Sequence, residues 1–252
     1  MTNQEILRIA QAQQAVDFNC APKDFTRDAN VVVISQTNEG AKKLPRLPYF
    51  CELVYFGTNV VASVDERIYD AVSDYLKDPA FPHYNLMTPN LHKLNAVIRE
   101  YGYFEDWQAE FWLPDVNALA ALPCPYETRL LLPDELQPLA ETQRWNNALS
   151  GVDDPRGDVL GVGAYDHGQL VGLAGCSDDC ERMWQIGIDV LPEYRRQGVA
   201  SALTSRLAVE ILARGKVPFY CCAWANLGSA RNAIRSGFRP AWAQLNAKEI
   251  EP

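Results

Sequence analysis

Two arginines and a glycine stand where a helix is expected to begin, in the stretch LPEYRRQGVASAL at residues 191–203. The first N–H groups of a helix lack acceptors within it, and the helix dipole makes that end positive. The loop from Arg195 to Ala200 therefore offers a cradle for a phosphate group. Gly198 lets the backbone approach an anion closely, and the arginines add charged donors. An ordinary solvated helix start is the alternative, but cations oppose the dipole there, so a bound anion explains them better.

The charge of the chain is distributed unevenly. Its 252 residues carry 23 Lys and Arg against 32 Asp and Glu, a net charge of −9. Residues 181–240 carry nine basic against four acidic residues, whereas the remainder carries 14 against 28. An anion site within an acidic protein fits this distribution. Nucleic acid and anionic membranes require a basic face and are not expected as partners.

The elements that position the cradle are read from apolar periodicity and from turn residues. From residue 123 onward we first expect a strand ETRLLLP and a helical region around ETQRWNNAL. Two strands follow, LGVGAYD and QLVGLAGCSDD, joined as a hairpin at His167-Gly168, and then a strand MWQIGIDVL that leads into the cradle. After the cradle we expect a helix over about 198–214, a strand VPFYCCAW, a short helix SARNAIRS and a strand FRPAWAQLNA.

The first half of the chain is also expected to mix helices and strands. After an N-terminal helix it reads as strands in NVVVISQ and CELVYFGTNVVASVD, a helix DERIYDAVSDYLKD, a short apolar segment HYNLMT, a helix NLHKLNAVIREYG and a strand WQAEFWLPD. The stretch LPDVNALAALPCP, punctuated by three prolines, is the expected junction. We therefore expect domains at residues 1–120 and 123–252.

The spacing Arg195-x-x-Gly198-x-Ala200, directly after a strand, resembles the pyrophosphate-binding signature of the GNAT superfamily, the acyl-coenzyme A dependent N-acyltransferases. Asn226, Ser229 and the pair Gly237-Phe238 fall at the spacing of that family's second motif. The resemblance covers about residues 123–252. It implies an α/β (α+β) fold whose mixed, mostly antiparallel sheet is flanked by helices and preceded by a smaller α/β domain.

The resemblance further implies acetyl-CoA as co-substrate and direct transfer of its acetyl group to a primary amine. The strand that ends at Val190 would separate from the strand VPFYCCAW, with the pantetheine arm between them. Asn226 is equally expected as a helix cap and as a cofactor contact. The full set of expected coenzyme-binding residues is Ile188, Val190, Arg195, Arg196, Gln197, Gly198, Val199, Ala200, Ser201, Asn226 and Ser229.

The residues that would move protons are less clearly indicated. Many members of the family have a tyrosine as general acid seven residues after the motif asparagine, and here that position is Ala233. The leaving thiolate must then be protonated by another group or by water, or leave unassisted. Asp189 is the candidate general base because it is the carboxylate nearest the reaction zone, and Tyr220 and Tyr165 are further candidates.

Other motifs are interpreted as structural. Seven cysteines in a chain without a secretion signal indicate reduced thiols. Cys176 and Cys180 lack a second ligand pair, so no metal is expected. The adjacent Cys221 and Cys222 are expected to pack in a strand and not to act as nucleophiles. The glycines of LGVGAYDHG precede a turn and not a helix, which disfavours a dinucleotide fingerprint. With no apolar run of about 18 residues, we expect no membrane span and a cytoplasmic location.

Three questions stay open at this point. The acceptor is a small molecule or peptide amine, with a cationic amine favoured by the acidic charge elsewhere. A non-catalytic acyl-CoA-binding regulatory protein is the alternative function, and the missing tyrosine is the feature that favours it. The N-terminal half is either an unrelated α/β domain or a degenerate GNAT-like half with Asp65, Glu66 and Asp70 where a cradle would need glycine and arginine. In both cases we expect it to bind no coenzyme. The sequence does not indicate the oligomeric state.

Overall fold

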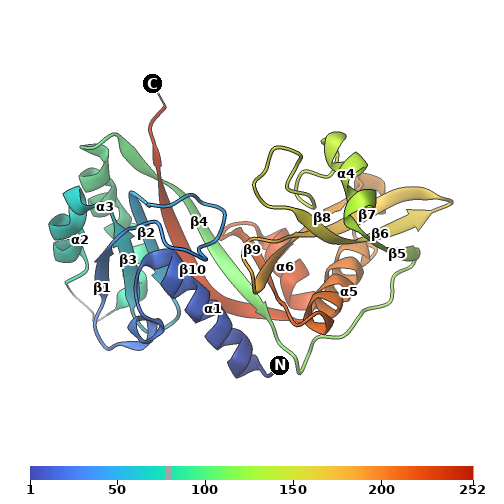
Figure 1. Cartoon of the computed structure of the whole chain (residues 1–252), viewed down its shortest axis with the longest axis horizontal. Helices are drawn as coiled ribbons and strands as arrows, with labels where there is room; N and C mark the ends of the chain where they lie inside the picture. The colour runs from blue at the N-terminus through green and yellow to red at the C-terminus, as the bar shows by residue number, and fades with distance from the viewer. Residues whose placement is uncertain (78–80, 252) are drawn as a thin grey trace. The chain divides into compact units, whose positions relative to one another are not determined.

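The computed structural model describes residues 1–77 and 81–251, and the chain divides into two compact units (Figure 1). Unit 1 comprises Met1–Ile6, Trp112–Cys222 and Asn226–Pro240. Unit 2 comprises Leu7–Phe111, Ala223–Ala225 and Ala241–Pro252. Both units combine strands and helices, so the expected α/β class is confirmed.

The sheet of unit 1 has the strand order β9–β8–β7–β6–β5. Neighbouring strands pair antiparallel except β8 and β9, which are parallel, so the mixed, mostly antiparallel sheet is confirmed. The strands are β5 (Glu127–Leu131), β6 (Asp158–Asp166), β7 (Gln169–Ser177), β8 (Met183–Val190) and β9 (Val217–Ala223), and the helices are α4 (Pro133–Glu141), the short 3-10 helix η4 (Pro192–Tyr194), α5 (Val199–Ala213) and α6 (Leu227–Arg235).

The hairpin between β6 and β7 forms where the sequence predicts it. His167 and Gly168 have φ angles of 46° and 83°, and positive values at both central residues are typical of a type I′ turn. This turn matches the right-handed twist of the strands it joins, and it fixes the pairing of Tyr165 with Leu170.

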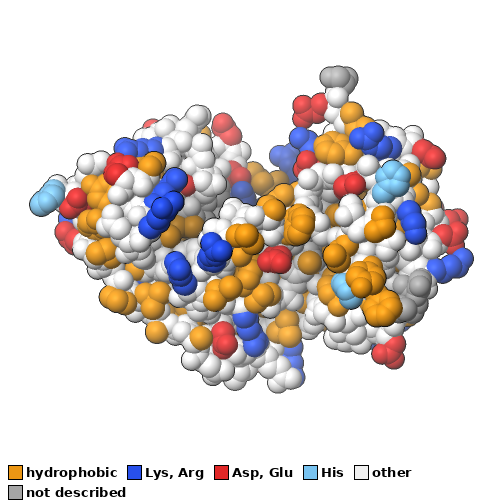
Figure 2. Space-filling model, turned by 180° about the vertical axis from the view of Figure 1, so that it is seen from behind, with side chains coloured by type: hydrophobic (Ala, Val, Ile, Leu, Met, Phe, Trp, Pro, Cys, Tyr) orange, Lys and Arg blue, Asp and Glu red, His pale blue; other side chains and the backbone are white. Residues whose placement is uncertain are grey.

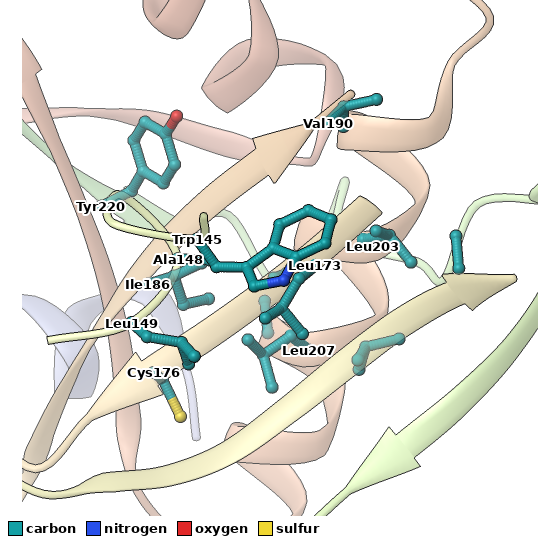
Figure 3. Close-up of a cluster of buried hydrophobic side chains, with 14 of the residues drawn as sticks. Trp145, Ala148, Leu149, Leu173, Cys176, Ile186, Val190, Leu203, Leu207 and Tyr220 are labelled. Atoms are coloured by element: carbon teal, nitrogen blue, oxygen red, sulfur yellow. The ribbon is translucent and has the colours of Figure 1, made fainter. Parts of the chain in front are cut away.

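Helices cover both faces of this sheet. A Cβ added to Gly161 would meet Leu136 of α4, whereas one added to Gly172 would meet Val199 and Leu203 of α5. Side chains of α5 at helical spacing fill the core between helix and sheet, and Figure 3 shows part of this cluster, including Leu203 and Leu207. The start of α5 is thereby fixed against the sheet directly after β8.

One expected helix lies elsewhere. The helical region predicted around ETQRWNNAL is wrong, because the helix is α4, which ends at Glu141, and residues 142–149 form turns. Pro133 occupies the first helical position, and the backbone N–H of Leu132 donates to the Glu135 carboxylate, which fixes the helix start eight residues earlier. The residues after α4 are bound to the sheet instead.

Unit 2 contains a second sheet region in the order β1–β3–β2–β10–β4. Its strands are β1 (Val31–Ile34), β2 (Cys51–Tyr55), β3 (Val60–Val64) and most of β4 (Tyr103–Pro114) and β10 (Phe238–Glu249). Its helices are most of α1 (Asn3–Phe18), α2 (Tyr69–Tyr75) and α3 (Asn90–Arg99), with 3-10 turns η1 (Pro22–Thr26), η2 (Glu66–Ile68) and η3 (Pro82–Leu86). The first residues of α1 and β10 and the last of β4 fall in unit 1. Apolar side chains of α2, α3, β2 and β3 form its core.

The end of the chain belongs to unit 2. Strand β10 pairs antiparallel with β2, from Ala243 opposite Tyr55 to Asn246 opposite Glu52. We expected a division into residues 1–120 and 123–252, and that division did not anticipate this pairing. The C-terminal segment therefore completes a sheet whose other strands come from the first half of the chain.

A buried polar cluster lies on the face of β2 opposite the core of unit 2. The Gln244 side chain donates to the Glu52 carboxylate over 2.6 Å and accepts from the Trp242 indole over 3.2 Å. Lys42 pairs with Asp17 of α1 at 3.1 Å. Burial raises the pKa of the Glu52 carboxyl to about 8, although the bond from Gln244 and the charge of Lys42 lower it.

This raised pKa predicts that unit 2 loses stability as the pH rises. The folded Glu52 keeps its proton up to about pH 8, whereas the unfolded chain releases it near 4.5, so the stabilisation present below pH 4.5 is lost as pH rises towards 8. Glu52→Gln should flatten the fall of the free energy of unfolding by up to about 1.4 kcal/mol per pH unit. Denaturant unfolding between pH 5.5 and 8.5 measures this. Glu249→Gln, at an exposed position on β10, should keep the slope of the parent. Equal slopes for the parent and Glu52→Gln would contradict the prediction.

Candidate active site

The pairing of β8 and β9 ends before either strand does. The strands run parallel from Met183 opposite Val217 to Ile186 opposite Tyr220, which is the last pair in the described chain. Beyond it, β8 continues to Val190 while pairing with β7. The expected separation of these two strands is confirmed. Backbone groups of β8 on this side are therefore available to a ligand with amide groups of its own.

Strand β8 leads through η4 into the predicted cradle. Gly198 has φ 84° and ψ −2°, in the left-handed region, and is the residue before α5. Arg196 also has a positive φ, 61°, which is uncommon for a residue with a side chain. The N–H of Ala202 bonds to the Gly198 carbonyl, so the preceding N–H groups of α5 lie before the helical hydrogen-bond ladder begins.

Side chains from several elements hold this loop in place. Arg195 Nε donates to the Val190 carbonyl over 2.9 Å, which ties the loop to the end of β8. The Tyr126 hydroxyl donates to Gln197 Oε1 over 2.7 Å, and its ring lies edge-on to Tyr194, with ring centroids 5.3 Å apart. Sequence reasoning missed Tyr126 because 71 positions separate it from Gln197 and no local pattern links them.

The first turn of α5 uses its side chains and its backbone differently. Val199 is buried against β7 at Gly172, and the Ser201 hydroxyl, also buried, donates to Asn232 of α6 over 3.1 Å. Ala200 is half-buried and small. Any contact of these residues with an anion would therefore come from their backbone N–H groups, as the sequence predicts for a cradle.

Helix α6 lies beside this turn and begins with the predicted asparagine. Asn226 Oδ1 accepts from the backbone N–H of Ser229 over 3.1 Å, so the interpretation of Asn226 as a cap is confirmed, while its contact with a cofactor stays a prediction. The Ser229 hydroxyl lies 2.6 Å from the Tyr220 hydroxyl. Ala233, at the position of the family's tyrosine, is completely buried.

The candidate base Asp189 is engaged with the segment that follows α4. Its carboxylate accepts from the backbone N–H groups of Asn147 and Ala148, over 2.9 and 3.0 Å, and from the Asn147 side chain over 2.7 Å. These bonds show a carboxylate that holds a loop against β8. Its role as general base stays a prediction.

Two glycines on neighbouring strands make this approach of the loop possible. Gly175 of β7 lies opposite Gly187 of β8. A Cβ at Gly187 would lie 1.7 Å from the Asn147 carbonyl oxygen, and one at Gly175 would lie 2.2 Å from that of Ala148. Both positions therefore require glycine, because the loop backbone occupies the space of a side chain.

The remaining candidates have packing or polar contacts of their own. Cys222 is buried, and Cys221 Sγ accepts from Gln185 Nε2 over 3.2 Å. The ring of Tyr165 on β6 packs under the Arg129 guanidinium at 4.6 Å, and β7 separates β6 from β8. In the part of the chain that the structure describes, no three His, Cys, Asp or Glu side chains are grouped to hold a metal ion.

A strand pair whose pairing ends early, followed by a glycine-bearing loop at a helix start, is a geometry that could hold an anion at the end of a strand. Residues 116–238 match the sequence profile of the acetyltransferase (GNAT) family, so the chain carries a domain of the GNAT family. This domain includes the split between β8 and β9, the cradle and α6. No curated protein matches the sequence significantly.

One solved structure shows the same fold over the whole chain, and others are similar over part of it. A GCN5-related N-acetyltransferase from Kribbella flavida aligns over 100% of this chain and 97% of its own, with 15% identity and a TM-score of 0.55. A GCN5-related N-acetyltransferase-like protein from Streptococcus suis 89/1591 aligns over 62% of this chain and 67% of its own (19% identity, TM-score 0.46). A GNAT-family protein from Novosphingobium aromaticivorans DSM 12444 aligns over 58% and 66% (19% identity, TM-score 0.42). The chain thus spans about two thirds of the length of the last two.

The close approach at Gly187 predicts that Gly187→Ala detaches the loop from β8. The added methyl group cannot coexist with the Asn147 carbonyl, so the free energy of unfolding should fall by more than about 2 kcal/mol. Urea unfolding measures this. Gly157→Ala is the matched control, since its Cβ would make only ordinary contacts with side chains, Asp178 at 3.4 Å and Val159 at 4.0 Å, and it should stay within about 0.5 kcal/mol of the parent. Equal destabilisation of both variants would show that the approach is not decisive.

Proposed function

We propose that the chain is an N-acetyltransferase that moves an acetyl group from acetyl-CoA directly to a primary amine. The observation that carries this proposal is the continuity of three features along one strand: the end of pairing at Ile186, the free run of β8 to Val190, and the cradle at Arg195–Ala200. A coenzyme with a pyrophosphate and a chain of amide groups fits this series of backbone donors and acceptors.

Different residues are proposed to bind different parts of the coenzyme. N–H groups of Gly198, Val199 and Ala200 and the exposed Arg196 side chain would hold the pyrophosphate, with the loop fixed by Arg195 and Gln197. Backbone groups at Ile188 and Val190 would bind the pantetheine arm and stabilise the negative charge that develops on the thioester carbonyl oxygen. Bound acetyl-CoA supplies the activated acyl group.

The acceptor is proposed to be a small-molecule or peptide amine, with a cationic amine favoured by charge. The net charge of −9 attracts cations over a distance. On the face that Figure 2 shows, basic and acidic side chains are interspersed with apolar ones, and no continuous basic field covers that face. No helix among the described residues is both long and apolar enough to cross a membrane.

A non-catalytic acyl-CoA-binding protein is the second candidate. The buried Ala233 favours it, because this position offers no proton donor. Incubation of the chain with acetyl-CoA and a panel of amines, followed by measurement of released thiol and acetylated amine, separates the two. Amine-dependent thiol release supports the enzyme. Coenzyme A binding without release for any amine class supports the second candidate.

The cradle predicts that Gly198→Asp weakens coenzyme A binding at least about tenfold, or about 1.4 kcal/mol. The carboxylate would repel the pyrophosphate, while Asp tolerates the left-handed backbone at this position. Gly198→Asn is the matched control, because it has the same size and backbone tolerance without the charge, and it should bind more tightly than Gly198→Asp. Calorimetry measures both. Binding by Gly198→Asp as tight as that of the parent would overturn the assignment.

Unit 2 is proposed to bind no coenzyme. At its strand-to-helix passage Asp65 accepts from the Arg67 backbone N–H and pairs with the Arg67 guanidinium at 2.8 Å. A carboxylate therefore occupies the place where a phosphate would need donors. The same calorimetric titration should return one coenzyme A per chain. A second site that survives Gly198→Asp would contradict this.

Direct transfer predicts that neither Cys221 nor Cys222 is a nucleophile. Changing both to alanine costs packing of about 1–2 kcal/mol, but the folded fraction should retain turnover because amine attack needs no covalent relay. Steady-state rates normalised to folded protein, with mass spectrometry during turnover, measure this. An acyl group on either cysteine of the parent, formed and consumed at the rate of turnover, would refute the prediction.

A further inference from the structure

The leaving thiolate requires a proton, and the helix position that carries a tyrosine in many family members cannot supply it. Ala233 has no donor and is completely buried in the core of unit 1. Tyr220 and Phe238 belong to the same cluster of buried residues, with their ring centroids 6.2 Å apart. The core that buries Ala233 of α6 therefore also contains a tyrosine, from β9.

Tyr220 lies where the two central strands separate. It is opposite Ile186 in the last pair between β8 and β9. Figure 3 shows its hydroxyl pointing away from the side chains of Leu173 and Leu207. The polar end of the ring thus lies at the margin of an apolar cluster.

The position of the split matches the reach of a ligand held at the cradle. Val190 and Ile186 are four residues apart on β8, which corresponds to about 13 Å of strand. A chain that is anchored by phosphates after Val190 and follows the free edge of β8 therefore approaches the pair Ile186–Tyr220 with its far end. In coenzyme A that end carries the sulfur.

The hydroxyl of Tyr220 is hydrogen-bonded to polar side chains of α6. It lies 2.6 Å from the hydroxyl of Ser229, a half-exposed residue in the first turn of α6, and Asn232 also hydrogen-bonds to it. Asn232 in turn donates to Thr204 and accepts from Ser201, both on α5. The phenol is thus fixed by Ser229 and Asn232 of α6, which are both half-buried, and Asn232 connects it to Ser201 in the first turn of α5.

We propose that Tyr220 donates the proton to the leaving sulfur and that Ser229 returns a proton to it from solvent. This inference rests on the proposed acetyltransferase function. As the amine nitrogen bonds to the carbonyl carbon, the carbon–sulfur bond breaks and its electron pair stays on sulfur. Tyr220 gives its phenolic proton to that sulfur. Ser229 then gives its proton to the phenolate and takes one from water, and the nitrogen of the newly formed amide loses its extra proton to solvent.

The protonation state of the tyrosine is consistent with this role. Burial raises the pKa of Tyr220, although the bonds from Ser229 and Asn232 lower it, so the phenol remains protonated throughout the neutral range. A neutral donor is available whenever the acceptor amine is reactive.

The test measures the titration of the coenzyme A thiol in its complex with the chain, by the ultraviolet absorbance of the thiolate, in parent and Tyr220→Phe. A phenol that donates to sulfur stabilises the thiolate, so Tyr220→Phe should raise the pKa of the bound thiol while the affinity at low pH stays unchanged. Turnover should fall roughly 10²-fold, which is typical for loss of a general acid. Ser229→Ala, which keeps the backbone N–H that binds Asn226, should reduce turnover less.

Tyr69→Phe is the matched control and should leave both the thiol titration and turnover unchanged, because Tyr69 is an exposed residue of α2 outside the matched residues 116–238. An unchanged thiol pKa in Tyr220→Phe overturns the assignment of the tyrosine alone. Failure of the parent to bind coenzyme A overturns it together with the proposed function. If the parent binds coenzyme A but acetylates no amine, the enzyme proposal fails. Even then, an unchanged pKa of the bound thiol in Tyr220→Phe would show that the phenol does not lie beside the sulfur.

Discussion

The end of pairing between β8 and β9 is the constraint on which the proposed chemistry depends. Parallel strands that stay paired satisfy each other's backbone groups and leave nothing for a ligand. Here the register stops at Ile186 and Tyr220, while β7 continues to hold β8 as far as Val190. The edge of β8 beyond Ile186 is therefore held in place by β7 without pairing to β9, and it leads through η4 to the cradle. Tyr220 is in the last pair of the two strands, so its side chain lies at the point where they separate.

Rigidity on the other side of β8 comes from an unusually close backbone approach. Gly175 and Gly187 admit the carbonyls of Ala148 and Asn147, and Asp189 fixes the N–H groups of the same segment. The strand is thus held by a neighbouring strand and by a loop packed on its face. In such a setting binding energy is not spent on ordering the strand. Asp189 contributes to this as a residue that positions the loop, whatever its part in proton transfer.

The two units have residues of opposite charge where a strand passes into a helix. In unit 1, Arg196 and Gly198 adopt left-handed conformations at a helix start, and basic residues surround an uncapped helix terminus. In unit 2, Asp65 caps its own turn and binds Arg67, so donors that could hold a phosphate are already used. The acidic excess of the chain therefore coexists with a local cluster of basic residues at the start of α5.

The sequence alone determined the features that depend on neighbouring residues. It predicted the strands of unit 1, the turn at His167-Gly168 and the start of α5 after Gly198, because periodicity, turn chemistry and glycine's backbone freedom act within a few positions. Even there it misplaced α4, since the competing contacts of Asn147 lie 42 positions away at Asp189. The pairing of β10 with β2, the contact of Tyr126 with Gln197 and the end of pairing at Tyr220 were decided by tertiary structure. Each of these three features depends on segments that are far apart in the chain, and tertiary packing decides which of their groups meet.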